Sequence, residues 1–398
     1  MLPEGWVRSP VKDYGDVSAG RQRSPSFTDG PMRPYLRVAN VFEAFIDIKD
    51  INEMPFTDRE YRRYKLEYGD ILLNEGQSTE LVGRPAMYKG EPANCCFQNT
   101  LVRFKANTKT DSNYALQRFL LCLYDGTFQA ISKKTTSIAH LGVSRFANLE
   151  LNWPPLPEQK KIAQILSTWD KAITTTEQLL TNSQQQKKAL MQQLLTGKNR
   201  LLDKNEVFFS GEWKPYLLSD VANIVMGSSP KSEAYNANGI GLPLLQGNAD
   251  IKNRRSAPRI FTSEITKECT IGDILLSVRA PVGTIALSVH KACIGRGIAT
   301  IKAKEKLDQT FLYHWLLWFE PKWCSFSQGS TFESINSDDI RNLRISLPRL
   351  EEQQKIAAVL SAVDHEITAL QKNLDAFKQE KKALMQQLLT GERRVKIQ

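Results

Sequence analysis

The sequence has few of the residues that bind metals or carry out redox chemistry. It contains four histidines and six cysteines among 398 residues. The cysteines show no spacing typical of a zinc site or a redox pair, and a chain of this length forms a core without disulfides. We therefore expect reduced thiols and no metal. The cysteines are Cys95, Cys96, Cys122, Cys269, Cys293 and Cys324.

Long hydrophobic runs are also missing. No apolar stretch reaches the roughly 20 residues that span a bilayer. The first residues, MLPEGW, lack the apolar core of a signal peptide. These absences predict a cytoplasmic protein that does not contact a membrane.

Motifs for catalysis are absent as well. The stretch Gly239–Gly241 lacks the third glycine of a dinucleotide-binding turn, and Gly227–Pro230 lacks the lysine of a phosphate-binding loop. Asn152–Pro155 resembles a base-methyltransferase motif only in composition, because its tryptophan stands in the wrong place. We predict no catalytic residue and no cofactor in this chain, which would recognise something on behalf of proteins that carry out the chemistry.

Basic residues outnumber acidic ones. The chain has 53 Lys and Arg against 43 Asp and Glu, which gives a formal charge of +10. An excess of this sign favours a polyanionic partner such as nucleic acid. Many basic proteins bind nothing acidic, so the charge alone leaves both possibilities open.

The most informative pattern is a segment that occurs twice. Residues 158–197 and 352–391 are 194 positions apart, and about 23 of their 40 aligned positions are identical. The run KKALMQQLLTG at Lys187–Gly197 recurs letter for letter at Lys381–Gly391. Such a duplication within one chain predicts pseudo-twofold symmetry and two equivalent sets of surfaces.

Both copies are predicted to be long helices with one apolar stripe. The apolar residues recur at alternating steps of four and three, which is the heptad pattern of a coiled coil. A helix of 35–40 residues is about 55–60 Å long, so the simplest partner for each copy is the other copy. The predicted seam residues are Ile162, Leu166, Trp169, Ile173, Leu180, Leu190, Leu194, Ile356, Leu360, Val363, Ile367, Leu370, Leu374, Phe377, Leu384 and Leu388.

Other residues indicate where these helices end and where polar groups interrupt the apolar seam. Gly197 and Gly391 stand where a left-handed C-terminal cap is expected. Thr176 and Ser183 place polar groups in the first seam, which predicts looser packing or a fixed register there. Prolines limit the helices at their N-terminal ends: Pro154, Pro155, Pro157 and Pro348.

Two segments of about 150 residues, the size of ordinary domains, precede the helices. Each mixes short β-type runs with glycine and proline and has one late helical stretch, which predicts an α+β fold. The two are distantly related, since Tyr68–Leu73 parallels Ile271–Leu276 and Pro34–Arg37 parallels Pro243–Gln246. The predicted organisation is a first domain at 1–157, a helix at 158–197, a second domain at 198–351, a helix at 352–391 and a tail at 392–398.

This order of domain, helix, domain and helix resembles the DNA-specificity subunit of type I restriction–modification systems. Matching strings include Pro348–Ala357, Leu384–Gly391, Gly272–Leu275 and Gly329–Thr331 ahead of Asn342-Leu343. The resemblance implies that each domain is a target-recognition domain for one half of a bipartite site on double-stranded DNA. The helices would form an antiparallel intramolecular coiled coil that spaces the domains and docks two methyltransferase subunits. Restriction–translocase subunits would join that complex, and S-adenosylmethionine, ATP and Mg would bind only the partner subunits.

Candidate DNA contacts are basic and amide or hydroxyl side chains, because these groups bind phosphates and base edges. Basic clusters such as Lys252–Arg255 are better candidates than single residues. In the first domain the candidates are Arg21, Arg23, Arg62, Arg63, Gln77, Arg84, Lys133, Lys134, Thr135 and Thr136. In the second domain they are Ser228, Ser229, Lys231, Gln246, Asn248, Arg254, Arg255, Arg279, Arg296, Ser330 and Thr331.

Two other classes of function remain open on the sequence alone. An enzyme with unusual motifs would methylate or cut DNA as a purified chain. A coiled-coil adaptor would bind only proteins and would show no salt-sensitive binding to DNA. The missing cofactor motif argues against the first, and two duplicated but diverged domains argue against the second.

Overall fold

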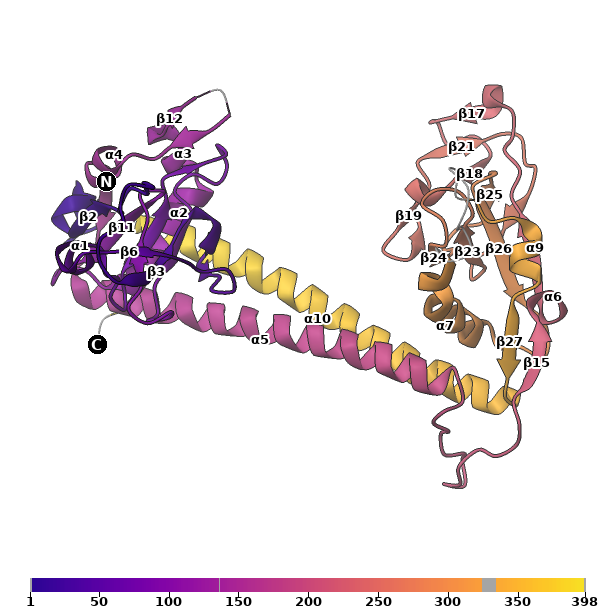
Figure 1. Ribbon diagram of the computed structural model, residues 1–398. Helices are drawn as coiled ribbons and strands as arrows, with labels where there is room; N and C mark the ends of the chain where they lie inside the picture. Colours follow the sequence, from indigo (N-terminus) through magenta and orange to yellow (C-terminus); the bar gives the residue numbers. More distant parts are fainter. Residues whose placement is uncertain (1, 136, 324–333, 397–398) are drawn as a thin grey trace. The chain divides into compact units, whose positions relative to one another are not determined.

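The computed structural model describes residues 2–135, 137–323 and 334–396 (Figure 1). These residues form two compact units, each of which takes part of both repeated helices. Unit 1 contains residues 1–177 and 373–398, and unit 2 contains residues 178–372. Sheets and helices mix in both, so the predicted α+β class is confirmed.

In unit 1 the main sheet has the order β2 (Gly15–Ala19), β11 (Leu101–Ala106), β7 (Ile71–Asn74) and β9 (Pro85–Met87). A second sheet has the order β10 (Cys96–Phe97), β3 (Met32–Leu36) and β6 (Asn52–Pro55). Smaller pairings are β1 (Val7–Pro10) with β14 (Glu150–Trp153), β4 (Val41–Phe42) with β5 (Phe45–Ile46), and β8 (Gly76–Gln77) with β13 (Ala139–His140) and β12 (Lys133–Lys134).

The helices of this domain are short except for one that covers the main sheet. They are α1 (Asp58–Tyr64), α2 (Ser112–Tyr124), α3 (Thr127–Ile131) and α4 (Val143–Ala147). Asp111 caps α2 by accepting a hydrogen bond from the backbone N–H of Tyr114. The rings of Phe119 on α2 and Phe104 on β11 meet edge to face at 5.0 Å, inside a fully buried aromatic core.

Unit 2 repeats this plan. Its main sheet has the order β16 (Ala222–Met226), β26 (Ile298–Ala303), β23 (Ile274–Ser277), β24 (Ile285–Leu287), β20 (Arg255–Ser256) and β19 (Ile251–Lys252). The second sheet has the order β17 (Tyr235–Asn236), β21 (Ile260–Thr262), β18 (Leu242–Leu245), β25 (Ala292–Ile294) and β22 (Glu268–Cys269). A third pairs β15 (Lys214–Leu217) with β27 (Arg344–Leu347).

The helices of unit 2 also follow the first domain. They are α6 (Leu218–Val221), α7 (Gln309–Phe319) and α9 (Ser337–Arg341), beside the short 3-10 turn η5 (Glu320–Lys322). Asp308 caps α7 as Asp111 caps α2, by accepting from the N–H of Phe311. Asp339 completes a capping box with Asn336 at the start of α9. That pair of aspartates, Asp338-Asp339, therefore starts a helix and does not form a nuclease site.

The repeated segments form α5 (Leu156–Leu194, 39 residues) and α10 (Leu350–Thr390, 41 residues). Each begins two residues before its predicted start, and Pro157 lies in the first turn of α5, where its missing N–H has no intrahelical partner to lose. Gly197 and Gly391 have the left-handed φ of a C-terminal cap, +69° and +84°.

Within each unit the two helices run antiparallel. In unit 1, Asp170 pairs with Lys381 at 2.6 Å and Glu177 with Lys378 at 2.7 Å. In unit 2, Lys187 pairs with Asp364 at 2.5 Å. Every predicted seam residue is buried or half-buried. The buried ones are Ile162, Leu166, Leu180, Leu194, Ile356, Leu360, Leu374 and Leu388, and the half-buried ones are Trp169, Ile173, Leu190, Val363, Ile367, Leu370, Phe377 and Leu384.

The polar seam residues are satisfied by specific partners. Ser183 donates to the carboxylate of Glu366 at 3.1 Å, and Thr176 donates to the backbone carbonyl of Ala172 at 2.8 Å. Both are buried. The hydroxyl of Ser183 therefore helps to set the helix register in unit 2, since a shift along α10 would separate it from Glu366.

Candidate nucleic-acid interface

A basic β-ribbon lies at the edge of the first domain, on the side away from the long helices (Figure 1). Strands β12 and β13 pair antiparallel, with Lys133 opposite His140, and β13 continues onto Gln77 in β8. Thr135 closes the turn, because both its N–H and its hydroxyl donate to the carbonyl of Ile138 at 2.8 Å. Lys133, Lys134 and Thr135 are exposed. A two-stranded ribbon of this kind fits the major groove of B-DNA.

The base of the ribbon is tied to the rest of the domain. His140 Nδ1 lies 3.0 Å from a carboxylate oxygen of Glu75, which is next to β8. Arg145 in α4 donates to the backbone carbonyls of Leu141 and His140 at 3.0 and 2.8 Å. These bonds hold the ribbon in one direction, so its lysines project from a fixed support.

In the second domain, candidate side chains follow the ends of two strands of the main sheet, β16 and β23, and of two strands of the second sheet, β18 and β25. The backbone N–H and the Nε of Arg296 both donate to the hydroxyl of Ser229, at 3.1 and 3.3 Å. Gln246 packs against the neighbouring glycines: a Cβ on Gly297 would lie 2.2 Å from the Gln246 carbonyl oxygen. The N–H of Val278, just before Arg279, donates to the Gly297 carbonyl. We call Ser228, Ser229, Gln246, Arg279 and Arg296 the loop-end cluster.

The same position in the first domain holds residues that we did not predict. Arg37 follows β3 as Gln246 follows β18, and Gln98 and Asn99 follow β10 as Gly295 and Arg296 follow β25. Arg37 is half-buried and pairs with Asp50 at 2.5 Å. The parallel between Pro34–Arg37 and Pro243–Gln246 was the signal that could have identified Arg37.

Three of the predicted arginines contact other side chains of the protein, and Arg254 among them remains exposed. Arg21 is buried, donates to Glu60 at 2.8 Å and stacks on Phe56. Arg84 lies over the ring of Phe42 at 4.8 Å, and burial lowers the pKa of its guanidinium. Arg254 binds Glu320 at 2.6 Å. These contacts give the three side chains partners within the protein.

The other candidates are spread over both domains. Asn248 is half-buried and begins the turn after Gln246. Arg23, Arg62, Arg63, Lys231 and Arg255 are exposed. Thr136, Ser330 and Thr331 lie outside the described residues.

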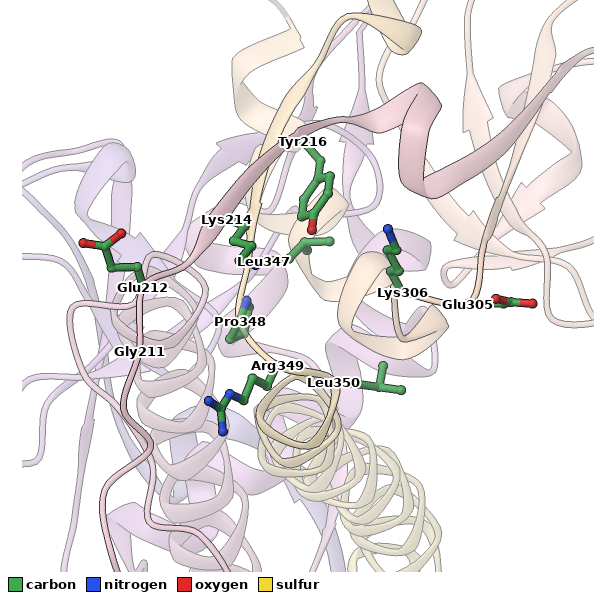
Figure 2. Close-up of a pocket in the computed structure, with 10 residues that line it drawn as sticks. All are labelled: Gly211, Glu212, Lys214, Tyr216, Glu305, Lys306, Leu347, Pro348, Arg349 and Leu350. Carbon is green, nitrogen blue, oxygen red and sulfur yellow. The ribbon is translucent and has the colours of Figure 1, made fainter.

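The cavity in Figure 2 has a volume of about 670 Å³ and lies where β15, β27 and the start of α10 meet. Tyr216, Lys306 and Leu350 surround its opening, while the carboxylates of Glu212 and Glu305 point away from it. This arrangement has no paired acid and base aimed at one point, so it offers no catalytic centre.

Metal and membrane features are also missing from the part of the chain that the structure describes. Its histidines, cysteines and carboxylates form no group of three that could hold a metal ion. Cys95, Cys96, Cys122, Cys269 and Cys293 are buried free thiols, whereas Cys324 is not described. Among these residues no helix is both long and apolar enough to cross a bilayer.

Known proteins identify the family. The family model described as the type I restriction modification DNA specificity domain matches residues 3–182 and 210–376. A protein of Methanocaldococcus jannaschii, provisionally named as the MjaX type I restriction enzyme specificity subunit, is 33% identical over 99% of this chain and 95% of its own length. The chain belongs to the type I restriction–modification DNA specificity family. Members are non-catalytic DNA-recognition subunits, so this specificity subunit is neither an enzyme nor a simple coiled-coil adaptor.

Solved structures show the same fold as this specificity subunit. The HsdS subunit of Thermoanaerobacter tengcongensis is 24% identical, covers 99% of this chain and 98% of its own, and gives a TM-score of 0.52. The type I S subunit of M. genitalium is 15% identical, covers 98% of both chains and gives a TM-score of 0.59. At such identities the likeness concerns the fold alone.

Proposed function

We propose that each domain of this specificity subunit reads one half of an asymmetric, bipartite site on double-stranded DNA. One observation carries the proposal: the parallel pair β3 and β10 in the second sheet of unit 1 corresponds to β18 and β25 in the second sheet of unit 2, but the side chains at the ends of these strands differ. Arg37, Gln98 and Asn99 in the first domain stand where Gln246, Gly295 and Arg296 stand in the second. Equal scaffolds would approach DNA in equal ways, and unlike side chains would read unlike bases.

The β-ribbon and the loop-end cluster would have different roles in DNA binding. Exposed lysines on the ribbon would contact phosphates, which adds affinity without sequence preference. Gln77, Gln246, Arg279 and Arg296 carry the amide and guanidinium groups that recognise base edges. The half-sites would then be unrelated in sequence, because a palindrome requires two identical readers.

The long helices would act as the spacer between the half-sites. A helix of 39 residues is about 58 Å long at 1.5 Å per residue, and DNA rises about 3.4 Å per base pair. Base pairs between the halves would remain unread. Changing the helix length should therefore change the distance between the halves and leave the bases chosen in each half unchanged.

The duplicated helices would also dock two methyltransferase subunits, since each copy offers an equivalent surface. Restriction–translocase subunits would join through that complex. S-adenosylmethionine, ATP and Mg would be held by those partners, and the complex would work in the cytoplasm, where bacterial and archaeal DNA lies. The absence of a cofactor motif in this sequence supports this division.

Exchanging residues 1–157 for the corresponding domain of a relative tests the proposal. The hybrid is produced with its modification subunit in a host, and methylome sequencing reads the modified motif. One half of the motif should change while the other half and the spacing stay as in the wild type. A change in both halves, or in neither, would overturn the two-reader proposal.

A further inference from the structure

Each domain packs against the first turns of one long helix: α5 in unit 1 and α10 in unit 2. In unit 1, Ile162, Ala163 and Leu166 of α5 are part of the domain's buried core. Gln159 ties the same end by donating to the carbonyl of Lys109 at 3.0 Å and accepting from the N–H of Asp111 at 3.0 Å. In unit 2 the equivalent Gln353 makes the same bonds to Lys306 and Asp308.

Farther along α5 the apolar contact ends and a polar bridge takes its place. Gln117 on α2 donates to Asp170 at 2.8 Å, and the other oxygen of Asp170 accepts from Lys381 of α10 at 2.6 Å. Gln117 is only 5% exposed. Asp170 and Lys381 line a cavity of about 460 Å³ at the margin of the core, together with the core residues Leu120 and Met385. One carboxylate therefore joins the domain to both helices.

The second domain has a bridge of different chemistry at the equivalent position. His314 lies on α7 as Gln117 lies on α2, six residues after the capping aspartate in each case. His314 Nε2 lies 3.1 Å from the hydroxyl of Ser361 on α10, whereas its Nδ1 lies 3.9 Å from Asp364 and makes no hydrogen bond. Asp364 pairs with Lys187 and lines another cavity of about 460 Å³. His314 is fully buried.

Apolar packing is nondirectional, whereas a hydrogen bond fixes both distance and angle. Asp170 lies four residues beyond Leu166, about 6 Å along the helix, so the polar bridge acts on the tilt of the domain from beyond the apolar contact. We propose that Gln117 and His314 are positioning residues that fix the tilt of each recognition domain on the helices. They thereby hold the distance between the two half-sites. This inference rests on the proposed function.

The discriminating experiment uses the full complex with its modification subunits and the motif found by methylome sequencing. Methylation is measured on duplexes whose halves are separated by the native spacing, by one base pair less and by one more. Gln117→Met keeps the size of the side chain and removes its amide. The preference for native spacing should fall about tenfold, the loss expected for one charge-assisted hydrogen bond, while the bases required in each half stay the same.

Two further variants test the mechanism. Gln117→His introduces the residue that the second domain has at this position, and Ser167 is the α5 equivalent of Ser361. This variant should therefore recover most of the preference for native spacing that Gln117→Met loses. Gln164→Met makes the same chemical change on an exposed glutamine of α5 and should behave as the wild type. If the Gln117→Met complex does not assemble, His314→Leu tests the same role in the second domain. It should also lower the preference for the native spacing.

Unchanged spacing preference in the variants that assemble would overturn the positioning role. An equal loss of methylation at all three spacings would do the same, because it would indicate general destabilisation. If the wild-type complex modifies no bipartite motif, the proposed function itself fails. The behaviour of the wild type thus separates the two failures.

Discussion

The guanidinium of Arg394 holds the buried carboxylate of Glu158 through two hydrogen bonds of 2.7 and 2.9 Å. Arg200 holds Glu352 in the same way, at 2.6 and 2.7 Å. The two arginines are 194 positions apart, as are the two glutamates. The segment after α10 therefore anchors the start of α5 in unit 1, and the segment after α5 anchors the start of α10 in unit 2.

Replacing either arginine by alanine should destabilise its own unit. The side chain of Glu352 is 1% exposed and that of Glu158 is 0% exposed, so each buried carboxylate would lose its charged partner. We expect Arg200→Ala to cost about 3 kcal/mol, near the lower end for a broken buried pair. Arg394 is 41% exposed against 23% for Arg200, so water screens it more and Arg394→Ala should cost less.

Urea unfolding of the purified variants measures these costs. Arg393→Ala provides the matched control, because Arg393 is exposed and adjacent to Arg394. The ion-pair explanation is wrong if the Arg393 and Arg394 variants lose the same stability, or if Arg394→Ala costs more than Arg200→Ala.

His314 should make the second domain less stable in mild acid. Burial lowers the pKa of His314 to about 4, with Lys187 adding to the effect and Asp364 opposing it. The unfolded chain takes up a proton below about pH 6.5, whereas the folded domain does not until about pH 4. The neutral ring of His314 therefore contributes fully to the free energy of unfolding above pH 6.5. That contribution is lost as the pH falls from about 6.5 to about 4, and the free energy of unfolding decreases by about 2 kcal/mol between pH 7 and pH 5.

Unfolding free energies at the two pH values, compared between the wild type and His314→Gln, isolate this contribution. The variant lacks the titrating ring, so its stability should depend less on pH by the same amount. Parallel pH profiles for the two proteins would show that the ring is not kept neutral by burial.

The helices were predictable because their signal is periodic. One face of α5 and α10 is buried or half-buried at every seam residue from Ile162 to Leu388. A stripe that recurs in steps of four and three can be read from the sequence without tertiary information. Short apolar runs also indicated some strands, since the strings Tyr68–Leu73 and Ile271–Leu276 contain most of β7 and β23. Ile71–Asn74 is fully buried and forms an apolar run that ends at Asn74.

The candidate DNA contacts were harder to choose because a basic residue in sequence has no fixed partner. Arg21 and Arg254 were as plausible as Arg296, but Glu60 and Glu320 lie 39 and 66 residues from them and bind them in the fold. Arg37 was not among the candidates, because the parallel between Pro34–Arg37 and Pro243–Gln246 gains meaning only when the pairing of β3 with β10 places Arg37 beside Gln98. Such choices depend on tertiary contacts that a local pattern does not contain.

The ribbon lysines should contribute affinity without sequence choice. Replacing Lys133 and Lys134 by glutamine in the assembled complex should weaken DNA binding about tenfold and reduce the salt slope of log K by up to about 2, because each phosphate contact releases about one counterion. Fluorescence titrations of a duplex carrying the modified motif at several salt concentrations measure both quantities.

Lys160 and Lys161 offer a matched control, since they are also adjacent exposed lysines but lie on α5. Their replacement by glutamine should leave the salt slope unchanged. If this pair lowers the slope as much as the ribbon pair does, the ribbon has no special role in phosphate contact.

Gly297→Ala should impair reading of the second half-site alone. A Cβ at Gly297 would lie 2.2 Å from the carbonyl oxygen of Gln246, which is a backbone atom, so the loop that carries Gln246 must move. Gly247→Ala is the control in the same loop, because it meets nothing within 4 Å and its φ of 177° is an ordinary extended value. With Gly297→Ala, methylome sequencing should show a lost or altered second half-site and an intact first half-site. With Gly247→Ala it should show the wild-type motif. A wild-type motif in both variants would remove the loop-end cluster from the reading surface.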